Sequence, residues 1–322
     1  MKKLEYKDLK SRRKAFYSVL KDQMPTIEKK WDNLKNNEPW LSVFDFKAVD
    51  LILGNIDMLI RVYLKFEQAF DAWKIGKSKD VCKKMKNDIA DVFNYTSYRD
   101  KLVTFFTDPV NGFDIYTCYY CETAYINLYN YHGTNRNYFD LDHILDKGTC
   151  PMLGLSMLNF VPSCQCCNEK IKRQKTFGYD KPKHKLTKKE IISASSHMMK
   201  LMPTSSSFDF DAWVKLEVVM KQLPQGKGFV KYKDTYSLSF MAKDSGYDDY
   251  INKLQLRERY EFHKNEALRL LDLRERYTDS TIKKISTLLG LTETHVKEDI
   301  FAIDFNQNEH RCFDKLRRDI MS

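Results

Sequence analysis

Aspartate, histidine and asparagine side chains gather near the middle of the chain, in a pattern able to place a metal ion beside a base. Asp142 and His143 are adjacent in YFDLDHILDKG, Asn159 follows in NFVPSC, and Asn168 comes directly after a cysteine. Carboxylate and amide oxygens are hard ligands suited to Mg²⁺ or Mn²⁺. A neutral imidazole beside them can take a proton from water. The pattern is compatible with a metal-dependent active site. The alternatives are a buried strand edge, or satisfied surface carboxylates with a bystander histidine. Asp140 could be a carboxylate that supports a metal ligand or a surface residue of the strand.

Two C-x-x-C pairs flank this segment. Cys118 and Cys121 precede it, and Cys164 and Cys167 follow after 42 intervening residues (122–163). Four thiolates can surround one tetrahedral Zn²⁺ at about 2.3 Å each, and such an ion stabilises a small β-structure that cannot bury a core of its own. We therefore predict a structural zinc site, with Cys166 as a bystander. The alternative is two coincidental cysteine pairs in a cysteine-rich chain.

The ordered set of both cysteine pairs, D-H, N and C-N resembles the HNH, or ββα-metal, endonucleases that carry a four-cysteine zinc site. The resemblance covers roughly residues 115–177. It implies that Asp142 and Asn168 ligate one catalytic Mg²⁺ or Mn²⁺, that His143 is the general base, and that Asn159 fixes the loop carrying this base. The implied activity is hydrolysis of phosphodiester bonds in nucleic acid, with DNA as the expected substrate.

The sequence departs from the family pattern at two places. Asp146 stands where many relatives have a proline, and Ile171, between Lys170 and Lys172, stands where many have a lysine. The first change affects the loop, and the second affects which lysine reaches a phosphate. Neither falls on the four residues expected to carry the chemistry.

Basic residues accompany the motif. The segment 168–190 holds nine Lys and Arg against three acids, and the whole chain has a formal charge of +10, which favours an anionic partner. We expect a short basic helix beginning at Asn168, on which Lys172 and Lys175 share one face and Lys170 and Arg173 another. The residues expected to contact the phosphodiester backbone are Lys147, Lys170, Lys172, Arg173 and Lys175. The alternative is a solvated basic face.

Periodicity predicts the elements that position these residues. Apolar residues recur at helical spacing over 4–108, which predicts four or five helices. Strand-like residues at 115–131, a turn at HGTN and a second strand at 137–144 follow, and WVKLEVVM pairs with GFVKYKDTYSLSF in a later hairpin. The last third is again helical. The predicted class is α+β, with a helical domain (1–110), a zinc-stapled HNH core (111–190) and a C-terminal hairpin-plus-helices region (191–322).

The chain lacks an apolar run of the roughly 18 residues that a membrane-spanning helix requires, and its basic start is not followed by a secretory apolar segment. We expect a cytoplasmic protein that does not enter membranes. In such a compartment the cysteines favour metal binding over disulfides.

A looser resemblance connects the D-H-I-L-D-K-G to C-N segment with nucleases of the Septu and retron-associated anti-phage defence systems. The late L-x-x-R-Y and K-L-x-R-D-I strings fit the same group. The resemblance implies a role in antiviral defence and an ATPase partner protein.

Two other functions remain open. Residues 282–300 match helix-turn-helix spacing around Gly290, which would suit a zinc-containing DNA-binding regulator. The second helix there carries Glu293, Glu298 and Asp299 against one lysine, which is a poor surface for phosphates. A catalytically silent zinc-knuckle binding module is the other alternative, but it has no need of Asp142, His143 and Asn168.

Overall fold

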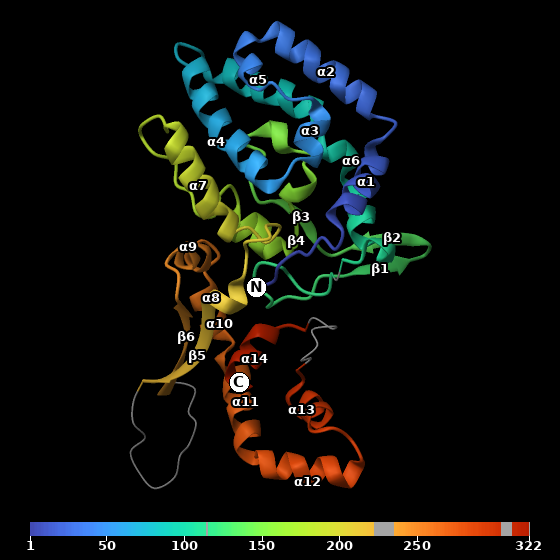
Figure 1. Cartoon of the computed structure of the whole chain (residues 1–322), viewed down its shortest axis with the longest axis vertical. Coiled ribbons are helices and arrows are strands. Elements are labelled where there is room, and N and C mark those ends of the chain that lie inside the picture. The colour runs from blue at the N-terminus through green and yellow to red at the C-terminus, as the bar shows by residue number, and fades with distance from the viewer. Residues whose placement is uncertain (114, 222–234, 304–310, 322) are drawn as a thin grey trace. The chain divides into compact units, whose positions relative to one another are not determined.

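The structure is a computed structural model that describes residues 1–113, 115–221, 235–303 and 311–321 (Figure 1). It has a mixed α+β architecture in which helices predominate and each sheet of the described residues is a two-stranded antiparallel pair. The predicted α+β class is confirmed. The specific zinc-stapled ββα core remains a prediction.

The chain divides into two compact units, described separately below. The first consists of residues 3–115 and 128–208, and the second of residues 1–2, 116–127 and 209–322. The three residue ranges predicted as domains remain a prediction.

Six α-helices occupy the start of the first unit, where four or five were expected, because a six-residue helix precedes the longest one. Their bounds are α1 (Leu9–Leu20), α2 (Met24–Asn37), α3 (Ala48–Leu53), α4 (Ile56–Trp73), α5 (Lys79–Val92) and α6 (Tyr95–Thr107). Short 3₁₀ turns η1 (Pro39–Val43) and η2 (Pro109–Asn111) accompany them. Asn55 starts α4 by accepting a hydrogen bond from the Met58 amide at 2.8 Å, which separates it from α3.

The apolar faces of these helices form the core of the unit. Trp31 of α2, Leu59 and Phe66 of α4, and Phe106 of α6 are fully buried. Further along the chain, α7 (Lys188–Lys200) packs against α4, and the two helices lie side by side in Figure 1. Packing of an apolar helix face against the core, rather than intrinsic helix propensity, stabilises most helices in globular proteins.

Two separate strand pairs follow the helices in the same unit. Strand β1 (Leu128–Tyr131) pairs with β2 (Thr134–Asn137), which confirms the turn predicted at HGTN. Strand β3 (Asp140–His143), which carries the D-H motif, pairs instead with β4 (Phe160–Ser163). The predicted pairing of the D-H strand with 115–131 is therefore wrong. The physical reason is burial: three of the four β3 residues and all of β4 are buried, whereas every residue of β1 is exposed.

The segment between β3 and β4 contains the 3₁₀ turns η3 (Pro151–Leu153) and η4 (Met157–Asn159), and the N-terminal helices hold it in place. Ser156 Oγ donates a hydrogen bond to the Leu51 carbonyl at 2.6 Å, and Lys86 Nζ donates to the Gly148 carbonyl at 2.7 Å. After β4 comes η5 (Cys166–Lys172), a short π-helix that ends where Arg173 adopts a φ of 51°. The short basic helix predicted over 168–177 therefore begins two residues earlier and ends at Lys172.

The second unit holds one strand pair and the C-terminal helices. Strand β5 (Val214–Met220) pairs with β6 (Tyr236–Ala242), as predicted, whereas the turn predicted at 223–227 and the start of the second strand lie outside the described residues. The helices are α8 (Phe210–Trp213), α9 (Gly246–Lys253), α10 (Leu256–Phe262), α11 (Lys264–Arg276), α12 (Asp279–Leu289), α13 (Glu293–Phe301) and α14 (Asp314–Met321).

Helices α12 and α13 occupy the segment with helix-turn-helix spacing. Gly290 ends α12 at a φ of 66°, and Ile282, Val296 and Phe301 form a small shared core. Within the described ranges of the chain, no helix combines the length and the apolar character needed to cross a bilayer.

Candidate functional site

Strand β3 and the loop after it bring the predicted catalytic residues into one region of the first unit. His143 lies opposite Phe160 of β4, and Asp142 lies opposite Val161. In a regular strand the neighbouring side chains of Asp142 and His143 would point to opposite faces. Strand β3 ends at His143, so the chain turns directly after the D-H pair.

Asn159 closes the loop that joins β3 to β4. Its fully buried side chain accepts a hydrogen bond from the Leu145 amide (2.7 Å) and donates to the carbonyls of Leu145 (3.0 Å) and Leu153 (3.1 Å). Its own carbonyl accepts from the Ile144 amide at 2.9 Å. Asn159 therefore fixes the backbone on the C-terminal side of His143.

Asp146, which stands where the HNH pattern often has a proline, turns the same loop. Its carboxylate accepts hydrogen bonds from the amides of Gly148 (3.1 Å) and Thr149 (2.8 Å), and from the Thr149 hydroxyl (2.8 Å). An aspartate in this role satisfies turn amides that a proline ring would leave to water.

The His143 imidazole is only 6% exposed and is held between two aromatic rings. The ring of Tyr95, from α6, meets it edge-on at 4.7 Å between centroids, and Phe160 does so at 4.8 Å. His143 Nε2 lies 3.0 Å from the Gly154 carbonyl, which can only accept, so Nε2 carries the proton and Nδ1 carries the lone pair. The ring is thus oriented with Nδ1 as its basic atom.

Burial is the main cause that lowers the pKa of the His143 imidazole to about 3, with smaller contributions from the positive charges of Lys147 and Lys172. A histidine in water titrates near ~6.5. The structure instead keeps this side chain neutral throughout the physiological range, with Nδ1 unprotonated.

Gly154 is required where it stands. A Cβ atom at this position would lie 2.7 Å from the Phe93 carbonyl oxygen, closer than real Cβ atoms approach backbone. The glycine therefore lets the carbonyl that holds His143 pack against the chain just before α6.

Asp142 and Lys172 form a buried ion pair. Lys172 Nζ lies 2.8 Å from Asp142 Oδ2 and donates a second hydrogen bond to the His143 carbonyl at 2.9 Å. The two side chains are 5% and 0% exposed. Lys172 therefore points inward rather than sharing an outer face with Lys175, because η5 ends immediately after it.

Asn168 contacts a carboxylate that the sequence left undecided. Its Nδ2 donates to Asp140 Oδ2 at 3.1 Å, so Asp140 orients the amide group of Asn168. The Nη2 atom of Arg99, from α6, lies 3.9 Å from the other oxygen of Asp140. Sequence reasoning missed Arg99, because nothing near it in the chain marks it as part of the D-H region.

A cavity of about 270 Å³ joins these groups. Its lining residues are Tyr95, Arg99, Asp140, Leu141, Asp142, His143, Asp146, Lys147, Asn168 and Arg173. The cavity thus contains the predicted base, both predicted ligands of the divalent metal, and three cationic side chains. Of the residues predicted to contact phosphate, Lys147 and Arg173 line it, while Lys170 and Lys175 are exposed elsewhere on the surface.

The oxygen donors of this cavity suit Mg²⁺ or Mn²⁺ in type, since both ions prefer carboxylate and amide oxygens. Within the described residues, however, the carboxylates do not close around one point as the cysteines do. The catalytic metal accordingly remains a prediction.

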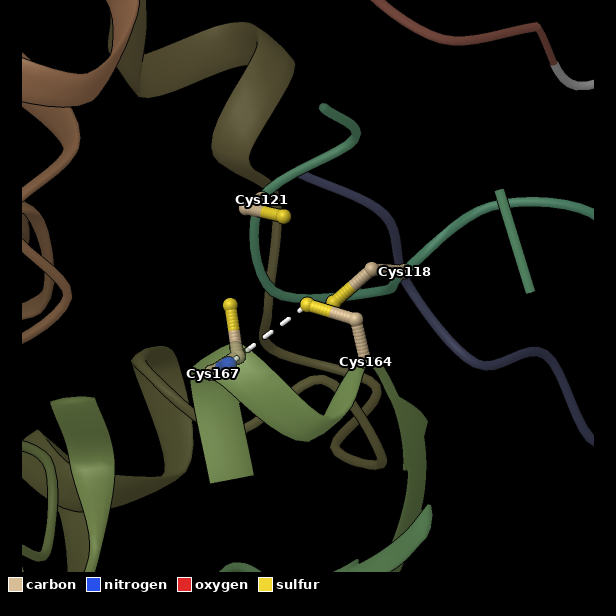
Figure 2. A group of neighbouring side chains, drawn as sticks. All are labelled: Cys118, Cys121, Cys164 and Cys167. Atoms are coloured by element: carbon tan, nitrogen blue, oxygen red, sulfur yellow. Dashed lines mark hydrogen bonds between the residues drawn. The ribbon is translucent and has the colours of Figure 1, made fainter. Parts of the chain in front are cut away.

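The four predicted zinc ligands do come together. The Sγ atoms of Cys118, Cys121, Cys164 and Cys167 all lie within 4.8 Å of one another, and all four residues are buried (Figure 2). A tetrahedral Zn²⁺ with bonds of about 2.3 Å needs sulfur atoms about 3.8 Å apart, so this cluster fits the ion in donor type and spacing.

Hydrogen bonds to sulfur support the same assignment. The Cys167 amide donates to Cys164 Sγ at 3.5 Å, shown as the dashed line in Figure 2, and the Thr123 hydroxyl donates to Cys121 Sγ at 3.2 Å. Such donors stabilise thiolates over thiols. Cys166 is exposed and stands outside the cluster, as expected of a bystander.

Comparisons of the chain with protein-family models, with curated proteins and with solved structures found no match.

Proposed function

We propose that this protein is a metal-dependent endonuclease of the HNH type that hydrolyses phosphodiester bonds in nucleic acid. The observation that carries the proposal is the 270 Å³ cavity, which combines a neutral, oriented histidine with oxygen donors and three cations. A base, hard metal ligands and phosphate-binding cations are the groups that metal-assisted phosphodiester hydrolysis requires.

In this mechanism His143 removes a proton from the attacking water through Nδ1. Its Nε2–H stays bonded to the Gly154 carbonyl, which stabilises the imidazolium that forms. The rings of Tyr95 and Phe160 keep the imidazole from rotating, and an anionic phosphate beside it would make proton uptake more favourable.

Asp142 and Asn168 would hold the divalent cation. Bound there, the cation would supply positive charge to the scissile phosphate and to the leaving oxygen. Lys172 Nζ contacts Asp142 Oδ2, and Asp140 orients the Asn168 amide, so both proposed ligands are positioned by a partner.

Arg99, Lys147 and Arg173 are the cations available to bind the phosphates of the substrate at this cavity. Their side chains come from α6, from the loop after β3 and from the residue after η5. This convergence of three separate elements supports a binding role more strongly than a run of lysines along one segment would.

We further propose DNA as the substrate, a role in anti-phage defence and an ATPase partner protein. The support for these three points is the resemblance in the segment from Asp142 to Asn168 and in the late arginine-containing strings.

The alternative DNA-binding regulator has weaker support. Glu293 and Glu298 belong to α13, the helix that would have to enter a DNA groove, and no cluster of cations accompanies them there.

The test is a cleavage assay with purified protein on plasmid, single-stranded DNA and RNA, with Mg²⁺ or Mn²⁺ added. Metal-dependent cleavage that disappears in His143→Ala and persists in His295→Ala is the expected result. Binding without cleavage under every condition would favour the regulator or a silent zinc module.

A further inference from the structure

A second, larger cavity adjoins the candidate catalytic cavity in the first unit. It has a volume of about 690 Å³, within the range of roughly 300–1,000 Å³ that is usual for small-molecule sites. It lies along α5 and the start of α6 and extends to the loop residues Gly148, Pro151 and Gly154.

The two cavities share a wall. Tyr95 and Lys147 line both of them, and Lys147 Nζ lies 4.2 Å from the centre of the Tyr95 ring. The same ring contacts His143 at 4.7 Å. A group bound in the second cavity would therefore be a direct neighbour of a phosphate bound in the first.

The lining of the second cavity combines three kinds of group. Tyr95 supplies a half-buried aromatic ring, and the buried residues Phe70 and Phe93 form apolar wall behind it. Asn87 and Thr96 supply hydrogen-bonding groups. Lysine side chains provide positive charge, and Lys86 holds its Nζ 5.1 Å from the centre of the Phe70 ring. Asp91 is the single acidic side chain of this lining.

Aromatic surface, amide groups and cations together suit a nucleobase attached to phosphate. Bases stack on aromatic rings and on flat cations, and amide side chains bond to base edges. A small inorganic anion would leave the aromatic surface unused, and an uncharged apolar ligand would leave the lysines unused.

We propose that this second cavity is a base pocket, which binds one unpaired nucleobase next to the scissile phosphate. The inference rests on the proposed nuclease function and narrows its substrate class. A base inside a duplex is stacked and paired and cannot enter a side pocket, so the preferred substrate carries an unpaired nucleotide at the cleavage site.

The experiment measures equilibrium binding of two fluorescent single strands of equal length and charge, by fluorescence anisotropy. One strand carries every base, and the other has a run of abasic sites at its centre. The protein carries His143→Ala, so that neither strand is cut during the titration. We expect the abasic strand to bind at least about tenfold more weakly, on the scale of losing base stacking on aromatic side chains.

Ala90→Trp tests the pocket directly, since Ala90 is a half-buried residue of α5 that lines it. This variant should lose the preference for the strand with bases and keep the weaker affinity for the abasic strand. Ala194→Trp is the matched control, because Ala194 is a half-buried helical alanine of α7 that lines neither cavity. Thermal melting should show both variants folded.

Two variants that each remove one lysine charge test the pocket independently. Lys83 lines the pocket and Lys84, its neighbour on α5, does not. Lys83→Gln should weaken binding of the strand with bases more than Lys84→Gln does.

Equal affinity for the two strands, or a preference that survives Ala90→Trp, would overturn the base pocket. Hydrolysis of bis(4-nitrophenyl) phosphate, a diester without a nucleobase, tests the nuclease function separately. Wild-type hydrolysis without base preference rejects the pocket alone. Base preference in a protein that hydrolyses no diester rejects the nuclease function alone.

Discussion

Lys172 neutralises Asp142 inside the protein: Nζ and Oδ2 lie 2.8 Å apart, and the two side chains are 0% and 5% exposed. A lysine expected to bind the substrate backbone is thus committed to the carboxylate beside the proposed base.

Lys172→Met should destabilise the fold, because it leaves the Asp142 carboxylate buried without its cation. Breaking one side of a buried pair costs about 3–5 kcal/mol, measurable by urea unfolding. The exposed neighbour provides the control: Lys170→Met should change the free energy of unfolding by less than about 0.5 kcal/mol. Adding Asp142→Asn to Lys172→Met should recover part of the loss, and strictly additive effects would contradict a direct pair.

His143→Ala should reduce metal-dependent cleavage by at least about a hundredfold, the usual scale for losing a general base. Zinc content should stay close to wild type, since the substitution leaves the cysteine cluster intact, and thermal melting should still show a folded protein. His295→Ala removes an exposed histidine of α13 and should leave turnover unchanged. Near-normal turnover of His143→Ala would remove this residue from the mechanism.

Arg99→Gln and Arg173→Gln should each flatten the salt dependence of single-strand binding by about 0.7 on a log–log scale, because each phosphate contact releases counterions. Anisotropy titrations at several salt concentrations measure the slope. Arg276→Gln, an exposed substitution in α11, should leave the slope as it is. If all three variants share the slope of the parent, the cavity cations do not contact phosphate.

Cys121→Ser and Cys167→Ser should each lose bound zinc, because a hydroxyl replaces one of four thiolate ligands. Elemental analysis should find one zinc per chain in the wild type. Cys166→Ser is the matched control, as this cysteine is exposed and lies outside the cluster, and it should retain the metal. A wild-type protein that is folded and active without zinc would contradict the assignment.

Asp314 should give the stability of the protein a specific pH dependence. Burial is the main cause that raises the pKa of its carboxyl to about 6, although Arg318 pairs with Oδ2. Its other oxygen, Oδ1, is buried and has no hydrogen-bond partner within the described part of the chain.

The folded state therefore binds the proton of Asp314 more tightly than the unfolded state, whose carboxyl titrates near ~3.9. The stabilisation is fully present below that pH and is lost as pH rises through about 6. Relative to Asp314→Asn, the wild type should lose on the order of 2 kcal/mol between pH ~4 and ~7, measured by urea unfolding at each pH. A pH-independent difference between the two proteins would contradict the raised pKa.

Sequence patterns predicted local features well and long-range pairing less well. The helices of 4–108, the turn at HGTN and the four-cysteine cluster follow from spacing, because each depends on neighbouring residues or on a rigid ligand geometry. The predicted partner of the D-H strand was wrong. Strand β3 pairs with the buried residues of β4, and the strand-like residues of 115–131 do not reveal that β1 is exposed.

The candidate site shows the same limit. Asp142, His143 and Asn168 could be identified from their types and order, whereas Arg99 could not, because only the packing of α6 brings it to Asp140. The inward position of Lys172 could not be predicted either, because it depends on a π-helix that ends at Lys172 itself.

Position 154 should differ from most loop positions in the substitutions that it tolerates. It bears no functional group and lies in a loop, a setting in which most positions accept many residues. Yet its carbonyl holds His143, and any side chain would collide with the Phe93 backbone. In a saturation mutagenesis screen for activity, we therefore expect that only glycine is tolerated at position 154. Loss of activity on every substitution of Gly154 would identify the active site as clearly as loss of activity on substitution of His143.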